Sequence, residues 1–131
     1  MSEKLNLIKD YINELNLRIV SEDTKEELVV VDDPENGIQN LIIDCEPPLV
    51  VLEQLIFEVK SESLDLFKRL LQMNRTLIHG AFVLDEAGKY VFFRDTLQLE
   101  HLDLNELEAS VHALTLALAE NGNELLEFAK K

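Results

Sequence analysis

The stretch that decides this fold is Ser61–Leu97, which reads SESLDLFKRLLQMNRTLIHG and then AFVLDEAGKYVFFRDTL. The first twenty residues predict a helix, because Ser61 or Ser63 can cap its start and apolar residues recur every three or four positions. The remainder predicts a β-hairpin, with a strand over 79–84, a turn over 85–88 and a return strand over 90–97. The residues that we expect on the inner side of the helix are Leu64, Phe67, Leu70, Leu71 and Asn74.

The return strand of this hairpin carries aromatic residues on both of its faces. Successive side chains of a strand point in opposite directions. One face therefore holds Tyr90, Phe92 and Arg94, and the other holds Val91, Phe93 and Asp95. Such a strand is either covered on both faces or has one face in a protein interface.

Upstream of this stretch the chain predicts a helix followed by strands. The segment 2–15 is amphipathic, Ser2 can cap it, and its apolar stripe consists of Leu5, Ile8, Ile12 and Leu15. Three short strands are expected over 18–21, 28–31 and 38–45. The last two flank the turn sequence DDPENG and so form a hairpin.

The next strand follows Pro47-Pro48, since proline cannot donate to a strand ladder. The run LVVLEQLIFEVK has no coherent helical face, and alternation favours a strand over 50–59. The alternation slips once, which predicts a β-bulge at Glu53-Gln54.

A final helix is expected to begin at a capping box formed by Asp103 and Glu106. The dipeptide Asn121-Gly122 predicts a break or end, followed by a further helical turn or two over 123–131. The apolar stripe of this helix consists of Leu104, Leu107, Val111, Leu114 and Leu118, widened by Leu102, Ala113, Leu116 and Ala117.

These elements predict an α+β fold in the order α-β-β-β-α-β-β-α, with three or four strands before the central helix. The sheet is mostly antiparallel and the helices pack against it. No linker or internal repeat divides the chain, so residues 1–131 are expected to form a single domain.

The charge of the chain bears on its partners. Acidic residues outnumber basic ones 26 to 12, and the formal net charge is −14. This field repels phosphate backbones and anionic lipids, so we expect neither nucleic acid nor membrane as a partner. No apolar run approaches the roughly 18 residues that span a bilayer. A charged N-terminus in place of a signal peptide predicts a cytoplasmic protein.

The sequence offers no pattern for catalysis, metal or cofactor. The three histidines His79, His101 and His112 lack metal-ligand spacing, so we expect no metal site. No phosphate-binding glycine motif occurs, and no cofactor is expected. Cys45 lies in an apolar run between Asp44 and Glu46, which predicts a structural thiol with a raised pKa. We therefore predict that the protein is not an enzyme.

The final helix and the return strand together offer more apolar surface than a small domain needs. That surplus predicts either a homodimer interface or a groove for a partner. The alternative is that all of it packs within the chain.

The segment 64–118, LDLFKRLLQMNRTLIHGAFVLDEAGKYVFFRDTLQLEHLDLNELEASVHALTLAL, resembles the class I type III secretion chaperones and the related YbjN and CesT/Tir-like domains. The Asn74-Arg75 pair that ends the central helix, the strand YVFFRDTL and the capped helix that opens LDLNELE carry the likeness.

The resemblance implies a homodimer that holds an extended or partly unfolded segment of another protein on apolar surface. Its alternative is a YbjN-like regulator or adaptor that docks a folded partner. The implied dimer contacts are Phe92, Val111, Leu114 and Leu118. A peptide-facing surface is expected at Leu28, Val30, Ile42 and Leu55, with plain core as the competing interpretation for all eight.

Overall fold

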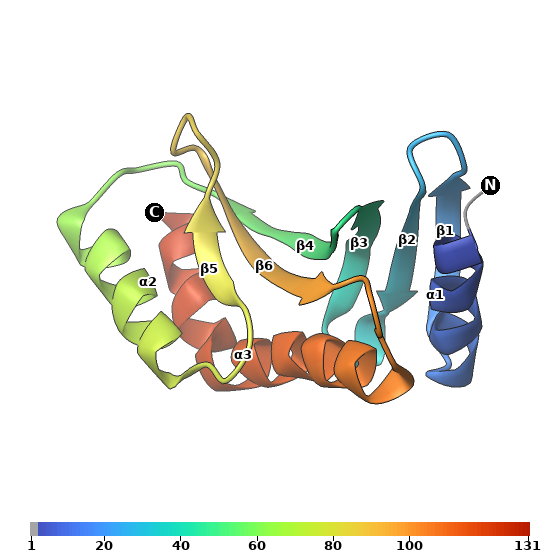
Figure 1. The fold of residues 1–131 in the computed structure, drawn as a ribbon. Coiled ribbons are helices and arrows are strands. Elements are labelled where there is room, and N and C mark those ends of the chain that lie inside the picture. The colour runs from blue at the N-terminus through green and yellow to red at the C-terminus, as the bar shows by residue number, and fades with distance from the viewer. Residues whose placement is uncertain (1–2) are drawn as a thin grey trace.

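The computed structural model describes residues 3–131, which form one six-stranded antiparallel sheet and three α-helices (Figure 1). The strand order across the sheet is β1-β2-β3-β4-β6-β5. The predicted α+β class is confirmed, and four strands precede the central helix. The elements are α1 (Glu3–Glu14), β1 (Arg18–Asp23), β2 (Leu28–Asp33), the 3₁₀ turn η1 (Pro34–Asn36), β3 (Ile38–Glu46), β4 (Leu49–Glu58), α2 (Leu64–Thr76), β5 (Ala81–Leu84), β6 (Tyr90–Gln98) and α3 (Leu104–Lys130).

Helices α1 and α3 cover the same face of the sheet, here called the inner face. The stripe of α1 is confirmed, since Leu5, Ile8 and Ile12 are fully buried. The Tyr11 hydroxyl donates to the Leu102 carbonyl just before α3, at 3.4 Å, which ties the two helices together. The predicted cap Ser2 lies outside the described residues. The sheet residues of the same core are Val29, Val31, Ile38, Leu41, Ile43, Cys45, Val50, Leu52, Phe57, Phe82, Val91 and Phe93.

Helix α2 packs at the β5 end of the sheet, and its buried face differs from the expected one. Ser63 caps it by accepting a hydrogen bond from the Leu66 amide at 3.1 Å. The predicted inner residues Leu64 and Leu71 are 77% and 72% exposed, so that prediction is wrong for both. The sequence of α2 contains a second set of apolar residues at helical spacing, and it is this set that packs against the sheet. The buried residues of α2 are Leu66, Leu70 and Met73.

Asn74 fixes α2 to the outer edge of the sheet. Its side-chain amide donates to the Phe82 carbonyl at 3.1 Å, and its oxygen accepts from the Phe82 amide at 2.7 Å. These two bonds imitate a neighbouring strand, so part of the β5 edge is already paired.

Helix α3 runs without interruption over 27 residues, so the predicted break at Asn121-Gly122 is wrong. Its start is as predicted, because the Asp103 carboxylate accepts from the Glu106 amide at 2.8 Å. Leu125 and Phe128 beyond the glycine are buried. Their packing offsets a helix-propensity cost of about 1 kcal/mol for the glycine.

Strand β4 contains a bulge, two residues later than predicted. Its register against β6 shifts between Leu55 and Phe57, which leaves Ile56 as the extra residue. The expected position, Glu53-Gln54, is in regular register with β6. A bulge bends its strand and increases the local twist.

Candidate binding surfaces

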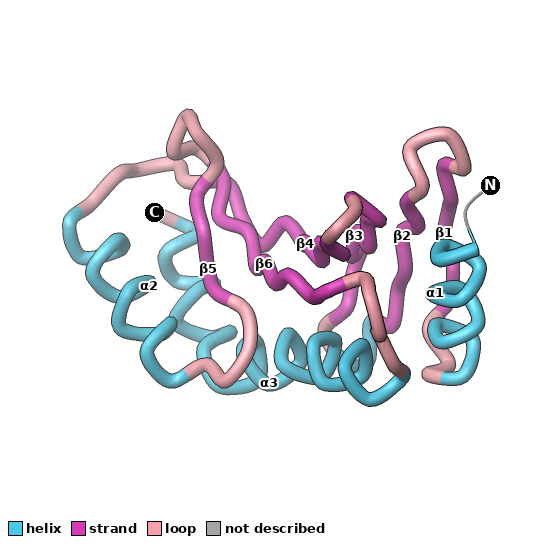
Figure 2. Tube along the Cα trace, in the orientation of Figure 1, coloured by secondary structure: helices cyan, strands magenta, loops and turns pink. Residues whose placement is uncertain are grey.

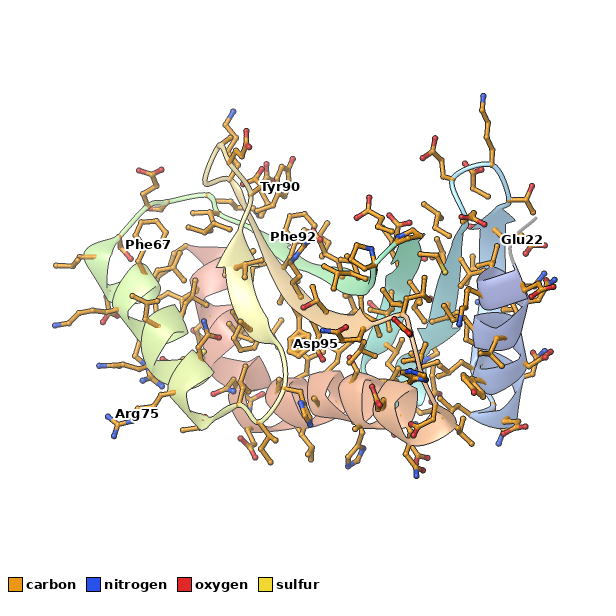
Figure 3. All side chains as sticks on the ribbon, viewed as in Figure 1. Glu22, Phe67, Arg75, Tyr90, Phe92 and Asp95 are labelled. Carbon is orange, nitrogen blue, oxygen red and sulfur yellow. The ribbon has the colours of Figure 1, made fainter. Side chains whose placement is uncertain are left out.

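The face of the sheet opposite α1 and α3, here called the open face, carries rows of apolar side chains. One row runs across three strands, from Val30 through Ile42 to Glu53, so that two apolar side chains are followed by a carboxylate. A second row joins Leu55 to Phe92, and Phe92 to Val83. Figure 3 shows Tyr90 and Phe92 on the side of β6 away from α3, with Asp95 on the side toward it.

Ion pairs neutralise some of the charges on the open face. Arg94 on β6 donates to Glu53 on β4 at 2.7 Å, and Arg18 donates to Asp32 at 2.9 Å. Ile42 and Leu55 beside these pairs are 39% and 52% exposed. The open face is therefore a mixed surface, in which solvent-accessible apolar side chains lie between paired charges.

The four residues predicted to face a peptide all lie on this face. Leu28 and Val30 of β2 are half-buried, and Ile42 and Leu55 are exposed. They come from three adjacent strands, β2, β3 and β4. The bulge at Ile56 places Leu55 on this face, while Phe57 is buried on the inner face.

Three of the four residues predicted for the dimer interface, Val111, Leu114 and Leu118, share one face of α3, and the fourth lies on β6. Phe92 is half-buried on the open face, and Leu118 is half-buried on α3. Val111 and Leu114 are 7% and 1% exposed in the chain's own core.

An apolar surface that the sequence interpretation missed lies on the outer side of α2. Leu64 and Leu71 project there, and Leu84 of β5 is 39% exposed. A cavity of about 310 Å³ between α2 and β5 is lined by Phe67, Leu70, Leu71, Phe82, Val83 and Leu84. The sequence does show Leu64 and Leu71 at helical spacing, but the sequence interpretation assigned both to the core.

Acidic side chains gather at the end of the sheet near the β3–β4 turn. Burial, followed by repulsion from Glu46 and Glu26, raises the pKa of Asp44. Burial, followed by the charges of Glu27 and Asp44, raises the pKa of Cys45 to about 11. The thiol is therefore protonated at neutral pH, and nucleophilic chemistry requires the thiolate.

His79 and His112 line one cavity of about 220 Å³ beside α3, and His101 lies in the turn before that helix. Within residues 3–131, no three His, Cys, Asp or Glu side chains are grouped so as to hold a metal ion. None of the helices described there is long and apolar enough to cross a membrane.

Comparison with known protein families finds a match to the CesT_Tir_1 model over residues 1–131. The chain belongs to the CesT_Tir_1 family. The resemblance drawn from 64–118 is thus confirmed, over the whole chain. Comparison with curated proteins found no significant match.

Solved structures with this fold share little sequence with the chain. YbjN from E. coli, described as a putative transcription regulator, is 13% identical over 92% of each chain, with a TM-score of 0.70. A chain of the ExoU–SpcU complex from the type III secretion system of Pseudomonas aeruginosa is 18% identical (94% of this chain, 98% of that one; TM-score 0.67). A chain of the HopA1–SchA chaperone–effector complex is 13% identical (96% and 92%; TM-score 0.62).

Proposed function

We propose that this protein is a non-enzymatic, chaperone-like binding protein that holds an extended segment of a partner protein on the open face of its sheet. The observation that carries the proposal is the convergence of Leu28, Val30, Ile42 and Leu55 on one face that no helix of the described chain covers. Membership of the CesT_Tir_1 family supports it. We place the protein in the cytoplasm.

The charge of the protein suits this role. A formal charge of −14 keeps the protein soluble while apolar side chains are exposed, and it favours partners that are basic. An unfolded segment can offer alternating apolar and basic residues to the apolar rows and to the acidic end of the sheet.

An unfolded basic protein tests this proposal, with reduced and carbamidomethylated lysozyme as the probe. Ile42→Ser removes an exposed apolar side chain from the centre of the open face, and we expect it to weaken binding about tenfold in 0.5 M NaCl. Fluorescence anisotropy measures the affinity. The matched control is Leu116→Ser, since Leu116 is 43% exposed on α3, away from the open face. Equal affinity of both variants for the probe would contradict the proposal.

The acidic end of the sheet favours a second candidate, an adaptor that docks a folded basic protein. Burial, followed by repulsion from Glu46 and Glu26, raises the pKa of Asp44 there, and a cationic surface would relieve that repulsion. Native lysozyme is the discriminating probe. Binding of the native form that equals the unfolded form and disappears in 0.5 M NaCl would favour the adaptor.

We also propose that the protein is a homodimer that associates through the outer surface of α2. Leu64 and Leu71 are the most exposed leucines on α2. Leu64 and Leu71 are seven residues apart and so lie on one face of α2. Two copies of α2 packed antiparallel about a two-fold axis bury these leucines together.

Leu71→Glu is expected to convert the dimer to a monomer, because it places a charge at the centre of this contact. Sedimentation equilibrium at micromolar concentration measures the mass. The side chain is exposed in the isolated chain, so the stability of the monomer should change by no more than about 0.5 kcal/mol. Leu126→Glu on α3, at a leucine that is 60% exposed, is the control and should stay dimeric. A wild-type monomer, or a dimeric Leu71→Glu variant, would rule this interface out.

A further inference from the structure

Strands β3 and β4 are paired along only part of their length. Their ladder runs from Glu46–Leu49 to Ile42–Glu53 and then stops, although β4 continues to Glu58. Figure 2 shows β4 turning away from β3 beyond this point. Within the described residues, no strand pairs with this last part of β4 on its β3 side, so its outward backbone groups form a short free edge inside the sheet.

Two backbone irregularities hold the strands apart. On β3, Asn40 has a φ of 53°, its amide donates at 2.7 Å to the Asp32 carboxylate on β2, and the β2–β3 register shifts beside it, between Val31 and Asp33. On β4, the bulge at Ile56, in the pairing with β6, bends the strand. The split is therefore built into both strands.

One buried side chain bridges the base of the split. Gln54 is 4% exposed; its amide donates to the Gly37 carbonyl at 3.0 Å, and its oxygen accepts from the Gln39 amide at 3.0 Å. These bonds satisfy the polar groups where the ladder ends. Beyond Gln54 the strands have no such bridge among the described side chains.

A cavity of about 420 Å³ fills the split, and the C-terminal part of α3 forms its floor. Leu118, Leu125 and Ala129 contribute apolar walls. Gly122 lies among them, and a Cβ atom added there would meet no atom within 4 Å. Leu55 and Leu126 line the same cavity and are 52% and 60% exposed, so it is open to solvent between them.

We propose that this split is a strand-insertion slot, in which an extended segment of the partner pairs with the free edge of β4 at Leu55–Glu58 and places an apolar side chain over Gly122. This inference rests on the proposed function and adds a second, distinct contact to it. The slot continues from the open face, because Leu55 belongs to both.

The chemistry of the slot identifies its occupant as a polypeptide. An unpaired strand edge offers alternating donors and acceptors that only an extended peptide backbone matches along its length. The apolar floor accepts a side chain such as leucine. Glu58 at the end of the edge is exposed, and the whole chain is strongly acidic, so the flanking residues of the segment are lysine or arginine.

The probe for the slot is the fluorescein-labelled peptide Lys-Leu-Lys-Leu-Lys-Leu-Lys, measured by anisotropy in 0.5 M NaCl. Gly122→Leu fills the cavity and is expected to weaken binding at least about tenfold. The matched control Gly122→Ala leaves most of the cavity open and should bind like the wild type. Both variants replace a helical glycine that has space around it, so neither should unfold the protein.

Hydrogen exchange tests separately whether the backbone of the peptide pairs with the free edge of β4. Binding of the peptide should slow hydrogen exchange of amides within Leu55–Glu58 in the wild type but not in Gly122→Leu. A peptide with N-methyl groups on alternate residues should lose this protection. The slot would be wrong if the wild type did not bind the peptide, or if Gly122→Leu bound it with the same affinity as the wild type.

The slot and the proposed function can fail separately. If Ile42→Ser weakens capture of unfolded lysozyme while Gly122→Leu leaves peptide binding unchanged, the slot is wrong and the open face stands. If the wild type captures no unfolded lysozyme yet binds the peptide in the slot, the proposed function fails and the slot stands.

Discussion

Gly80→Ala is expected to destabilise the protein by about 2–5 kcal/mol, because two separate penalties coincide at this position. Gly80 has a φ of 76°, a left-handed conformation that costs an L-residue about 1–2 kcal/mol. An added Cβ would also lie 2.4 Å from Cζ of Phe93. Overpacking of this kind costs about 1–3 kcal/mol. Urea denaturation followed by circular dichroism measures the loss.

Phe93 cannot move away easily, and this is why the clash is costly. It is 3% exposed and packs edge-to-face on Phe82, with ring centroids 5.9 Å apart. Phe82 is in turn held by Asn74 through its backbone. The absence of a side chain at Gly80 therefore matters for three features. These are the start of β5, the packing of α2 on the sheet and the core beneath β6.

Gly88→Ala is the matched control. Its φ is 69°, but the nearest atom to an added Cβ is Oε1 of Glu62 at 4.0 Å. Only the backbone penalty of about 1–2 kcal/mol applies there. Equal losses in the two variants would mean that the contact with Phe93 contributes nothing.

The sequence predicted elements whose pattern is local. The stripe of α1, the alternating faces of β6 and the cap of α3 at Asp103 are each set by residues a few positions apart. The face of α2 was not predictable in this way, because it carries leucines on two sides. Which side is buried depends on the sheet, which is formed by distant residues.

The same distinction separates the two candidate sites. The open face could be predicted in part: alternation puts Leu28 and Val30 on one side of β2, and the register of β2, β3 and β4 adds Ile42 and Leu55 to that side. The slot could not be predicted, because it forms where β3 and β4 diverge above α3, and these three elements are far apart in the sequence. In the sequence Gly122 suggested a helix break. In the structure the helix is continuous, and the glycine leaves open space beside it.

Leu114→Ala is expected to destabilise the protein by about 2–5 kcal/mol, the range for truncating a buried leucine. Leu114 is 1% exposed within the chain itself. The sequence interpretation named it as a candidate for the dimer interface, with plain core as the competing interpretation, and the two roles differ in one measurable respect. The cost of a core cavity is independent of protein concentration, whereas the stability supplied by an interface rises with concentration.

The measurement is therefore urea denaturation of Leu114→Ala at two protein concentrations a hundredfold apart, in both the wild-type and the Leu71→Glu backgrounds. We expect the same loss in all four cases, because the missing methyl groups leave a cavity between α3 and the sheet whether or not a second copy is bound. Leu116→Ala, two residues along the same helix at a side chain that is 43% exposed, should cost no more than about 0.5 kcal/mol. A loss at Leu114 that vanishes in the Leu71→Glu background would instead assign Leu114 to the contact between copies, and the surplus apolar surface of α3 would then be shared between the core and the dimer.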